Sequence, residues 1–385
     1  MKNALMDNDQ YKGLLAIDRN LDRLNKGIEL LTYLNPLNSE KEKQKFFTSK
    51  YTEAPKFRYP KRNFNAFKLQ QGLFLNNLEE IHDDHIRTLY QSIIYYYSNV
   101  LQCSDVIGEK KKFFYNSLRL YGAPKERDVQ NAKFIIHIKN QHQDDPKIYS
   151  AQDAISYFGD FVKNYEFHMN IKLSTSIAAD AMVSNKLQTL FVKKNARFSE
   201  NQLKTLANHE IGVHMVTTFN GRNQPLKIFS NGFPKNVETQ EGLAVFSEYM
   251  SGALTLERLK TLAYRVIAAD SLTDGYDFAD TFDLLHNQYK LDRDKAFIIT
   301  LRVHRGGGFT KDFLYLTGLK KVYDYYIQNG DLSLFLTGKV SLEHQSSITR
   351  MLDLGLVHKP IHLTQSYNHN YNTNKTIDFI LENLR

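Results

Sequence analysis

The sequence predicts a mostly helical α+β fold with one small sheet. Apolar residues recur at helical spacing through the first third of the 385 residues, and again from Ser199 almost to the C-terminus. Between these regions, three short segments are apolar or alternate between apolar and polar residues, as strands do. Helices that pack on a small sheet and surround it form an α+β arrangement.

The first third of the chain is predicted to be an α-helical layer. Residues 14–34 form an amphipathic helix, Pro36 interrupts the pattern, and Asn38 or Ser39 can cap the next helix. Residues 73–120 are again helical and are rich in aromatic side chains. The helical layer then stops at a glycine and a proline.

A domain boundary is expected after that stop, the segment "YGAP" at 121–124. Residues 1–125 would form the helical layer. Residues 126–385 would form the second domain, and the two parts together would make one compact unit.

The predicted sheet takes its strands from the middle of the chain. Residues 132–139, 166–174 and 186–192 are the expected strands, with a helix over 150–165. The chain is then predicted to be helical. Breaks in this later region are expected at Asn220-Gly221, 231–236, 305–308 and Gly355.

Composition excludes several classes of protein. The net charge of +8 is spread over the chain, and without zinc-finger spacing or a ribonucleoprotein motif it indicates a solvated basic surface and not a nucleic-acid-binding face. No apolar run is long enough to span a membrane, and residues 1–18 lack the apolar core of a signal peptide. Cys103 is the single cysteine, so it is expected to pack as an apolar residue in a protein of the reducing cytoplasm. The sequence predicts no oligomeric state.

The stretch "NHEIGVH" at 208–214 lies within a predicted helix from about 200 to 219. Ser199 and Gln202 form an S-x-x-Q capping box at its start, and Asn220-Gly221 is expected to end it. His209 and His214 are five residues apart, which leaves them about 140° apart on an α-helix. A widened, π-type turn at 209–214 would align them, and Gly212 gives that turn backbone freedom.

A third candidate metal ligand follows in a second helix. Glu241 in "VETQEGLAVFSEY" would lie near the helix start, with Thr239 as its N-cap. Gly242 would let the two helices approach closely. Glu210 points about 100° away from His209, so it would act as general base on a metal-bound water and not as a ligand. The alternative is an ordinary helix that carries two histidines. The Glu-Gly pair near the start of the second helix offers a third ligand and so favours the metal site.

At "NHEIGVH" and "TQEGLA" the sequence resembles the bacterial proteins named after their QEGLA motif, the flavohemoglobin expression-modulating QEGLA motif proteins. These are related to the microtubule-associated tyrosine carboxypeptidases, which carry an H-E-x-x-x-H zinc motif. The resemblance extends to segments near the N-terminus and to "LRVHRGGGFTKDFLYLTGL" at 301–319, and so covers most of the chain.

The resemblance implies a zincin-like metallopeptidase core and a Zn²⁺ cofactor. By position, the family's zinc ligands fall on His209, His214 and Glu241, and its catalytic glutamate falls on Glu210. The implied activity is that of a zinc metallopeptidase, a carboxypeptidase that removes a C-terminal residue with metal-activated water. Its partner would be the C-terminus of a peptide or protein. The composition reads as bacterial, where tubulin is not the expected substrate.

Substrate-binding residues are predicted less directly. The segment 186–192 would be an edge strand that pairs with the substrate backbone, or a purely structural edge. Arg302 and Arg305 are candidates to bind the substrate carboxylate, and Tyr315 and His304 to stabilise the oxyanion; each is also compatible with a surface role. A further set, Glu238 and Glu248, offers acceptors for histidine N–H groups, although solvent exposure is favoured for both.

The competing functional hypothesis is a non-catalytic regulator or binding protein that keeps the metallopeptidase fold. In such a protein one or more of the four motif residues, for example Glu210, would be replaced. Because the four motif residues are intact, the sequence favours the enzyme.

Overall fold

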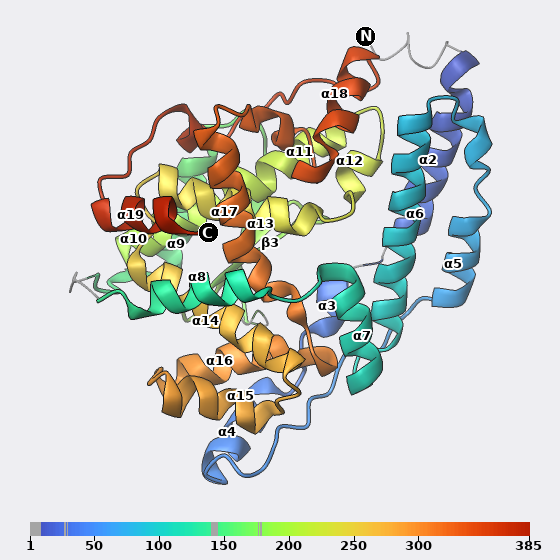
Figure 1. The fold of residues 1–385 in the computed structure, drawn as a ribbon. Coiled ribbons are helices and arrows are strands. Elements are labelled where there is room, and N and C mark those ends of the chain that lie inside the picture. Colours follow the sequence, from blue (N-terminus) through green and yellow to red (C-terminus); the bar gives the residue numbers. More distant parts are fainter. Residues whose placement is uncertain (1–8, 27, 29, 140–144, 176, 178) are drawn as a thin grey trace. The chain divides into compact units, whose positions relative to one another are not determined.

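The computed structural model describes residues 9–26, 28, 30–139, 145–175, 177 and 179–385. They confirm a mostly helical α+β fold (Figure 1). The chain groups into two compact units, each built from separate stretches of sequence. The first unit contains 1–12, 139–258 and 317–384, and the second contains 13–138, 259–316 and residue 385. The domain boundary expected at residue 125 stays a prediction.

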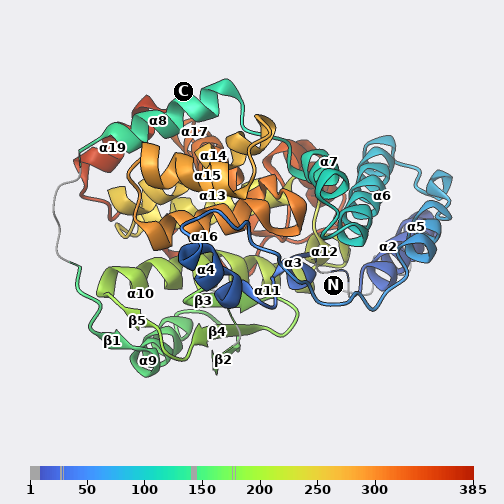
Figure 2. The same cartoon turned by 90° about the horizontal axis from the view of Figure 1, so that it is seen from below.

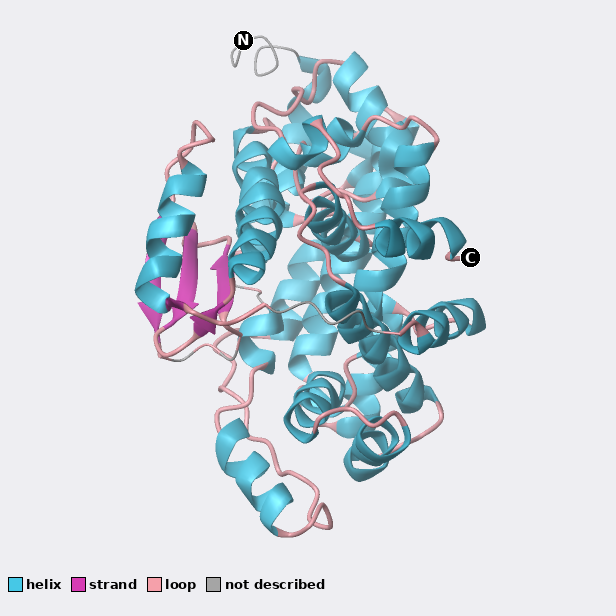
Figure 3. Cartoon of the chain, turned by 90° about the vertical axis from the view of Figure 1, so that its left-hand side faces the viewer, coloured by secondary structure: helices cyan, strands magenta, loops and turns pink. Residues whose placement is uncertain are grey.

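The first unit holds the sheet. Strands β2 (Asn170–Ser174), β4 (Thr189–Lys193) and β3 (Ala181–Ser184) are ordered β2-β4-β3, with β2 parallel and β3 antiparallel to β4. Helix α9 (Ala151–Val162) packs against β2 and β4 (Figures 2 and 3). A separate two-residue ladder joins β1 (Tyr149–Ser150) to β5 (Arg197–Phe198).

The expectation that 186–192 is an edge strand is wrong. β4 is the central strand of the three, because β3, which we did not predict, covers its other side. β3 pairs with β4 through Val183 opposite Leu190 and Met182 opposite Phe191. The two edge strands of the sheet are therefore β2 and β3.

The helices of the first unit surround α13 (Asn236–Met250). Every residue of α13 from Thr239 to Met250 is buried, so this helix lies in the core of the unit. Polar groups on a helix buried on all sides need partners within the protein. The other helices of the unit are η1 (Asp9–Tyr11), α10 (Glu200–Leu206), the π-helix η3 (Ala207–Met215), α11 (Val216–Asn223), α12 (Ile228–Asn231), η7 (Leu332–Leu336), η8 (Leu342–His344), α18 (Gln345–Asp353), η9 (Gln365–Asn368) and α19 (Lys375–Asn383).

The second unit is helical. In it α5 and α6 lie side by side (Figure 1). The core contains Phe113, Phe309 and Cys103, and burial raises the pKa of the Cys103 thiol to about 12, which confirms that it packs as an apolar residue. Its helices are α2 (Lys12–Asn25), α3 (Leu30–Leu34), α4 (Ser39–Thr48), α5 (Ala66–Phe74), η2 (Leu78–Glu80), α6 (Asp84–Asp105), α7 (Lys110–Tyr121), α8 (Glu126–His137), α15 (Phe278–Asp283), η4 (Leu284–Gln288), α16 (Arg293–His304), η5 (Arg305–Gly307) and η6 (Thr310–Phe313). Two helices, α14 (Leu256–Thr273) and α17 (Leu314–Ile327), have residues in both units.

The predicted strand 132–139 is wrong, because residues 132–137 belong to helix α8, which ends at His137. The backbone N–H of Lys125 donates to the carboxylate of Asp128 at 2.8 Å, which starts the helix upstream of the apolar run. Asn131, Ala132 and Ile135 are the buried residues, and their spacing is that of one helix face. A short apolar run does not distinguish a strand from a buried helix segment.

Other predicted boundaries also change. The helix expected over 14–34 is two helices, α2 and α3, with residues 27 and 29 outside the described part of the chain. The helical region 73–120 is divided among α5, α6 and α7. Across the residues that the structure describes, no helix combines the length and the hydropathy that crossing a membrane requires. The first eight residues of the stretch compared with a signal peptide lie outside the described residues.

The predicted helix stop at Asn220-Gly221 is wrong, because α11 continues to Asn223. Asn220 binds a distant part of the chain instead: its side-chain amide donates to the carbonyls of Leu336 and His362 and accepts the N–H of His362. A Cβ on Gly221 would lie 2.6 Å from the carbonyl oxygen of Phe229, so this glycine permits a close backbone approach inside the helix. The breaks at 231–236, 305–308 and Gly355 are confirmed.

Candidate metal centre

The helix that carries both histidines begins at the predicted capping box. Ser199 Oγ accepts the backbone N–H of Gln202 at 3.1 Å, and the Gln202 side chain accepts the N–H of Ser199 at 3.2 Å. This reciprocal pair satisfies two backbone donors that have no partner within the helix. It fixes where α10 begins, and with it the direction of the side chains that follow.

The helix widens where the two histidines lie. η3 is a π-helix over Ala207–Met215, which confirms the predicted widened turn. Bonding from residue i to i+5 places residues five apart above one another. The rings of His209 and His214 are therefore neighbours, with centroids 4.9 Å apart and planes inclined by 79°.

Hydroxyl groups from two other elements bind the carbonyls of this π-helix. Ser247 Oγ in α13 donates to the carbonyl of Asn208 at 3.0 Å, and Thr364 Oγ1 donates to that of Gly212 at 2.6 Å. A Cβ on Gly212 would meet only ordinary contacts, the nearest being the Tyr165 hydroxyl at 3.5 Å. Tertiary hydrogen bonds thus support the widened turn, and the glycine is not sterically required there.

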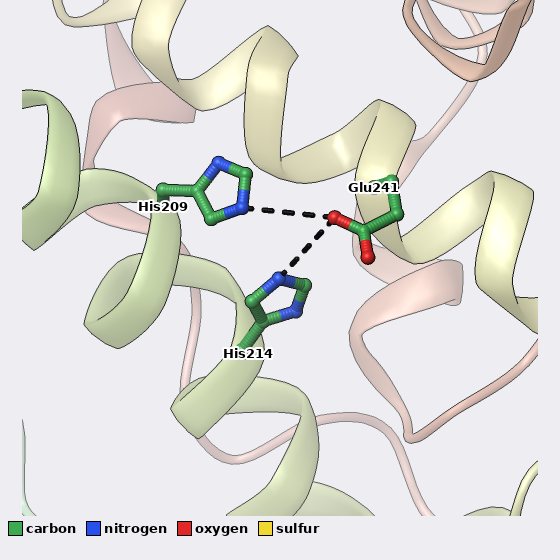
Figure 4. A group of neighbouring side chains, drawn as sticks. All are labelled: His209, His214 and Glu241. Carbon is green, nitrogen blue, oxygen red and sulfur yellow. Dashed lines mark ion pairs between the residues drawn. The ribbon is translucent and has the colours of Figure 1, made fainter. Parts of the chain in front are cut away.

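Glu241 reaches both histidines from α13. Its Oε2 lies 3.7 Å from Nε2 of His209 and 3.7 Å from Nε2 of His214 (Figure 4). One ligand atom from each of the three side chains lies within 4.8 Å of the others. His209 and Glu241 are buried and His214 is partly exposed, so solvent reaches the group on one side.

The donor set of this group fits zinc. Two imidazole nitrogens and one carboxylate oxygen are a three-residue set found in catalytic zinc sites, which leave a fourth position for water. With zinc bonds of about 2.1 Å, tetrahedral ligand atoms stand about 3.4 Å apart. The two observed separations of 3.7 Å are close to this value, so small side-chain movements would suffice.

A buried carboxylate holds His209 from the opposite ring nitrogen. Nδ1 of His209 donates to Oε1 of Glu248 at 2.8 Å, and Glu248 is fully buried. Burial alone would lower the pKa of His209, but the carboxylates of Glu241 and Glu248 outweigh it and raise this pKa to about 10. The group therefore attracts positive charge, which suits a dication as well as a proton.

The favoured expectation that Glu238 and Glu248 are exposed is wrong for Glu248. Its burial is tolerated because Arg258 pairs with it, and Arg258 and His209 hold the pKa of Glu248 below its ordinary value although burial raises it. Glu238 is mostly buried too, and it binds Thr317 at 2.8 Å and Lys321 at 2.6 Å instead of a histidine.

Glu210 lies beside His209 in the π-helix but is not part of the three-residue group. Its Oε2 accepts the backbone N–H of Val183 in β3 at 3.3 Å. The carboxylate therefore bridges the histidine helix and the edge strand of the sheet. This side chain is the candidate general base.

A model of a known family matches residues 44–385, which include all four of these motif residues. That family is described as microtubule-associated tyrosine carboxypeptidase. The chain belongs to this family.

One relative of this carboxypeptidase-family chain is a mouse protein (Mus musculus) with the name "Putative tyrosine carboxypeptidase MATCAP2". The two are 25% identical over 341 residues, which cover 85% of this chain and 57% of the mouse protein. The chain thus spans little more than half the length of this relative.

Two expectations about α13 of this carboxypeptidase-family chain are wrong. Thr239 is not the N-cap, because α13 begins at Asn236 after Lys235 in a left-handed conformation, and Thr239 Oγ1 accepts the N–H of Leu342. Gly242 does not serve the approach of α13 to the histidine helix. A Cβ on Gly242 would overlap the backbone of Gly318, so this glycine lets α13 touch α17.

Arg302 and His304, two of the candidate substrate-binding residues, lie in the second unit. Arg302 forms a two-point ion pair with the buried carboxylate of Asp312, with Nη2 2.9 Å from Oδ1. Nε2 of His304 lies 2.8 Å from Oγ1 of Thr281. Both side chains therefore have partners inside their own unit.

The other two candidates, Arg305 and Tyr315, also belong to the second unit. The guanidinium of Arg305 lies over the ring of Phe309, 5.0 Å from its centroid. The ring of Tyr315 is faced by Arg265 at 5.1 Å and by Lys311 at 4.8 Å. The proposed roles of all four residues in substrate binding stay predictions.

Sequence reasoning missed two contacts of the site. Arg258 reaches Glu248 after a turn that no local pattern marks. Val183 contributes only its backbone N–H, which any residue except proline carries. The one available signal was the short alternation around "AMVS" at 181–184, which would have located β3.

Proposed function

We propose that this protein is a zinc-dependent carboxypeptidase that removes one C-terminal residue from a peptide or protein. The observation that carries the proposal is the meeting of His209, His214 and Glu241 within the family-matched region. Tyrosine is the first candidate for the residue removed, because the family and the mouse relative are named for it. This preference is part of the proposal, since the chain spans only 57% of that relative.

His209, His214 and Glu241 would hold the zinc ion. When bound, zinc supplies a Lewis acid that polarises the substrate carbonyl and lowers the pKa of a water molecule. Glu210 is the proposed general base: it takes a proton from the water that attacks the carbonyl and passes it to the departing amine. The hydrogen bond from Val183 orients the Glu210 carboxylate at the edge of the sheet.

The roles predicted from the sequence for four further residues are also part of the proposal. Arg302 and Arg305 would bind the terminal carboxylate of the substrate, since a guanidinium offers two parallel N–H donors. Tyr315 and His304 would donate to the carbonyl oxygen as it gains negative charge.

Three broader statements belong to the same proposal. The core is zincin-like, the chain is one of the QEGLA-motif members of its family, and it acts in the cytoplasm. The motif pair supports the first two, and the single, buried cysteine agrees with a reducing compartment.

The proposal is tested with a pool of peptides that differ in their C-terminal residue. Purified wild type and Glu210→Gln are each incubated with the pool, and mass spectrometry follows the loss of single residues. We expect loss by the wild type only, with tyrosine removed first. Zinc content is measured on both proteins, because Glu210→Gln should keep its zinc.

Two outcomes would redirect the proposal. Cleavage inside the peptides by the wild type alone would make the protein an endopeptidase. No cleavage by a zinc-loaded wild type, together with a Glu210→Gln protein that restores every cellular effect, would establish the non-catalytic regulator instead.

A further inference from the structure

His209 uses its two ring nitrogens in opposite directions. Nε2 faces the Glu241 carboxylate at 3.7 Å, and Nδ1 donates to Oε1 of Glu248 at 2.8 Å. His214 is held differently: in the described part of the chain its imidazole is paired with Glu241 and no carboxylate lies on its other nitrogen. Of the two histidines, His209 is therefore the one whose ring orientation is fixed from behind.

Glu248 is fixed in turn by Arg258. Nε of Arg258 donates to Oε2 at 3.1 Å and Nη2 donates to Oε1 at 3.0 Å, so the two planar groups meet at two points. The Glu248 side chain is fully buried, whereas that of Arg258 is 25% exposed. A two-point arginine–carboxylate pair restricts orientation more than a single contact does.

The backbone around this pair is also constrained. After α13 ends at Met250, the N–H groups of Ala253 and Leu254 both donate to the carbonyl of Glu248. The N–H of Arg258 then donates to Oγ1 of Thr255 at the start of α14. The turn between the two helices thus returns Arg258 to the carboxylate that it binds.

We propose that Arg258 and Glu248 are positioning residues of the metal site, an inference that rests on the proposed function. Arg258 fixes the Glu248 carboxylate, and Glu248 holds the His209 ring with its proton on Nδ1, which leaves Nε2 for the metal. Carboxylates that accept a hydrogen bond from a ligating histidine orient the ring and increase its basicity. Arg258 therefore acts on the metal only through Glu248.

The alternative is a purely structural pair that fixes the turn between α13 and α14. Zinc affinity, measured by competition with a chromophoric chelator, separates the two. Glu248→Gln should weaken zinc binding about 10- to 100-fold, and Arg258→Met should weaken it less. Arg258→Lys should recover only part of the loss, because an ammonium group cannot reproduce the two-point contact.

The double variant Glu248→Gln/Arg258→Met gives the sharpest readout. If Arg258 acts through Glu248, the double variant binds zinc no more weakly than Glu248→Gln alone. If the fold-losses in zinc affinity of the two single variants multiply in the double variant, the two residues act independently, and the proposal that Arg258 acts through Glu248 is overturned. A matched control pair has its carboxylate on the same helix. Glu238 in α13 pairs with Lys321 in α17, so Glu238→Gln/Lys321→Met should leave zinc affinity within about twofold of wild type.

A second measurement needs no variant. In the zinc-loaded wild type, nitrogen NMR of the imidazoles should show the His209 proton on Nδ1; a proton on Nε2 would overturn the inference. The result is separable from that of the proposed function. A wild type that binds no zinc contradicts the proposed function and the inference together, whereas tight zinc binding that Glu248→Gln and Arg258→Met leave unchanged contradicts only the positioning role.

Discussion

The backbone N–H of Val183 donates a hydrogen bond to the Glu210 carboxylate at 3.3 Å. Val183 lies in β3, at one edge of the three-stranded sheet, and Glu210 lies in the π-helix. Strand and helix are thus joined through the group that we propose as general base. This contact makes the direction of the carboxylate depend on a main-chain atom.

Val183→Pro removes that N–H and should lower kcat/KM by about 10- to 100-fold, since a hydrogen bond to a charged group contributes roughly 1.5–3 kcal/mol. Proline is tolerated on an edge strand where the N–H does not serve the ladder. Val183→Ala keeps the N–H and is the control, expected within about threefold of wild type. Equal rates for wild type and Val183→Pro, measured on one peptide, would show that the contact has no role in catalysis.

His209→Ala and Glu241→Ala should each lose most of the zinc, because a site with two of its three protein ligands no longer competes with water. Elemental analysis after dialysis against metal-free buffer measures the zinc per chain. His85→Ala is the matched control, since His85 is an exposed histidine in α6. Full zinc content in both ligand variants would mean that the metal binds elsewhere.

Alanine substitutions at Gly212 and Gly242 should differ strongly in their effect on stability. Gly212→Ala adds a Cβ that meets only ordinary contacts, so the free energy of unfolding should change by less than about 1 kcal/mol, and can increase because alanine favours a helix. Gly242→Ala should destabilise the protein by about 3 kcal/mol, because the added Cβ overlaps the Gly318 backbone. Chemical denaturation of the two variants measures this difference, and similar values would contradict the packing described for Gly242.

His304 should make stability depend on pH in a defined window. Burial lowers the pKa of His304 from its usual value of 6.5 to about 4. Between these values the unfolded chain binds a proton that the folded chain does not, so this residue destabilises the protein as pH falls from about 6.5 to about 4. The slope is at most about 1.4 kcal/mol per pH unit.

The measurement is the free energy of unfolding of wild type and His304→Gln across that range. Glutamine can keep a hydrogen bond to Thr281 but does not titrate. As pH falls from about 6.5 to about 4, the free energy of unfolding of the wild type should decrease relative to that of His304→Gln, because only the wild type carries the titrating imidazole. A difference that is constant with pH would contradict the lowered pKa.

Zinc affinity should also depend on pH, through His209. Its pKa is raised to about 10, so zinc binding below that pH must displace a proton. Apparent affinity should therefore rise about tenfold per pH unit between pH 7 and 9.

The stability of the zinc-free chain should change in the opposite direction with pH. The stabilisation from the protonated His209 is fully present below pH 6.5 and is lost as pH rises through about 10. Chelator competition and denaturation across pH check the two trends.

Local chemistry explains what the sequence could predict. The capping box at Ser199 and Gln202 depends on residues three apart, and the π-helix follows from the five-residue spacing of His209 and His214, so both could be read from one stretch of sequence. The third candidate ligand, Glu241, was located by the same motif pair. The bacterial origin inferred from composition stays a prediction.

Tertiary contacts explain what could not be predicted. Glu248 carries a charged side chain that a local pattern would leave in solvent, and only its contacts with His209 and Arg258 make its burial favourable. Residues 132–139 have an apolar run that suits a strand, yet a helix start upstream decides their structure. The partner of Gly242 lies 76 residues later in the chain, beyond the reach of any pattern around the motif.

The contact between Gly242 and Gly318 has a consequence for how this site can evolve. Gly242 directly follows Glu241, so a candidate ligand is attached to the chain where two helix backbones touch without side chains between them. At this point main-chain contact, and not the size of a side chain, sets the separation of the two helices. The position of the Glu241 backbone is therefore insulated from drift in the surrounding core, as long as neither glycine is replaced.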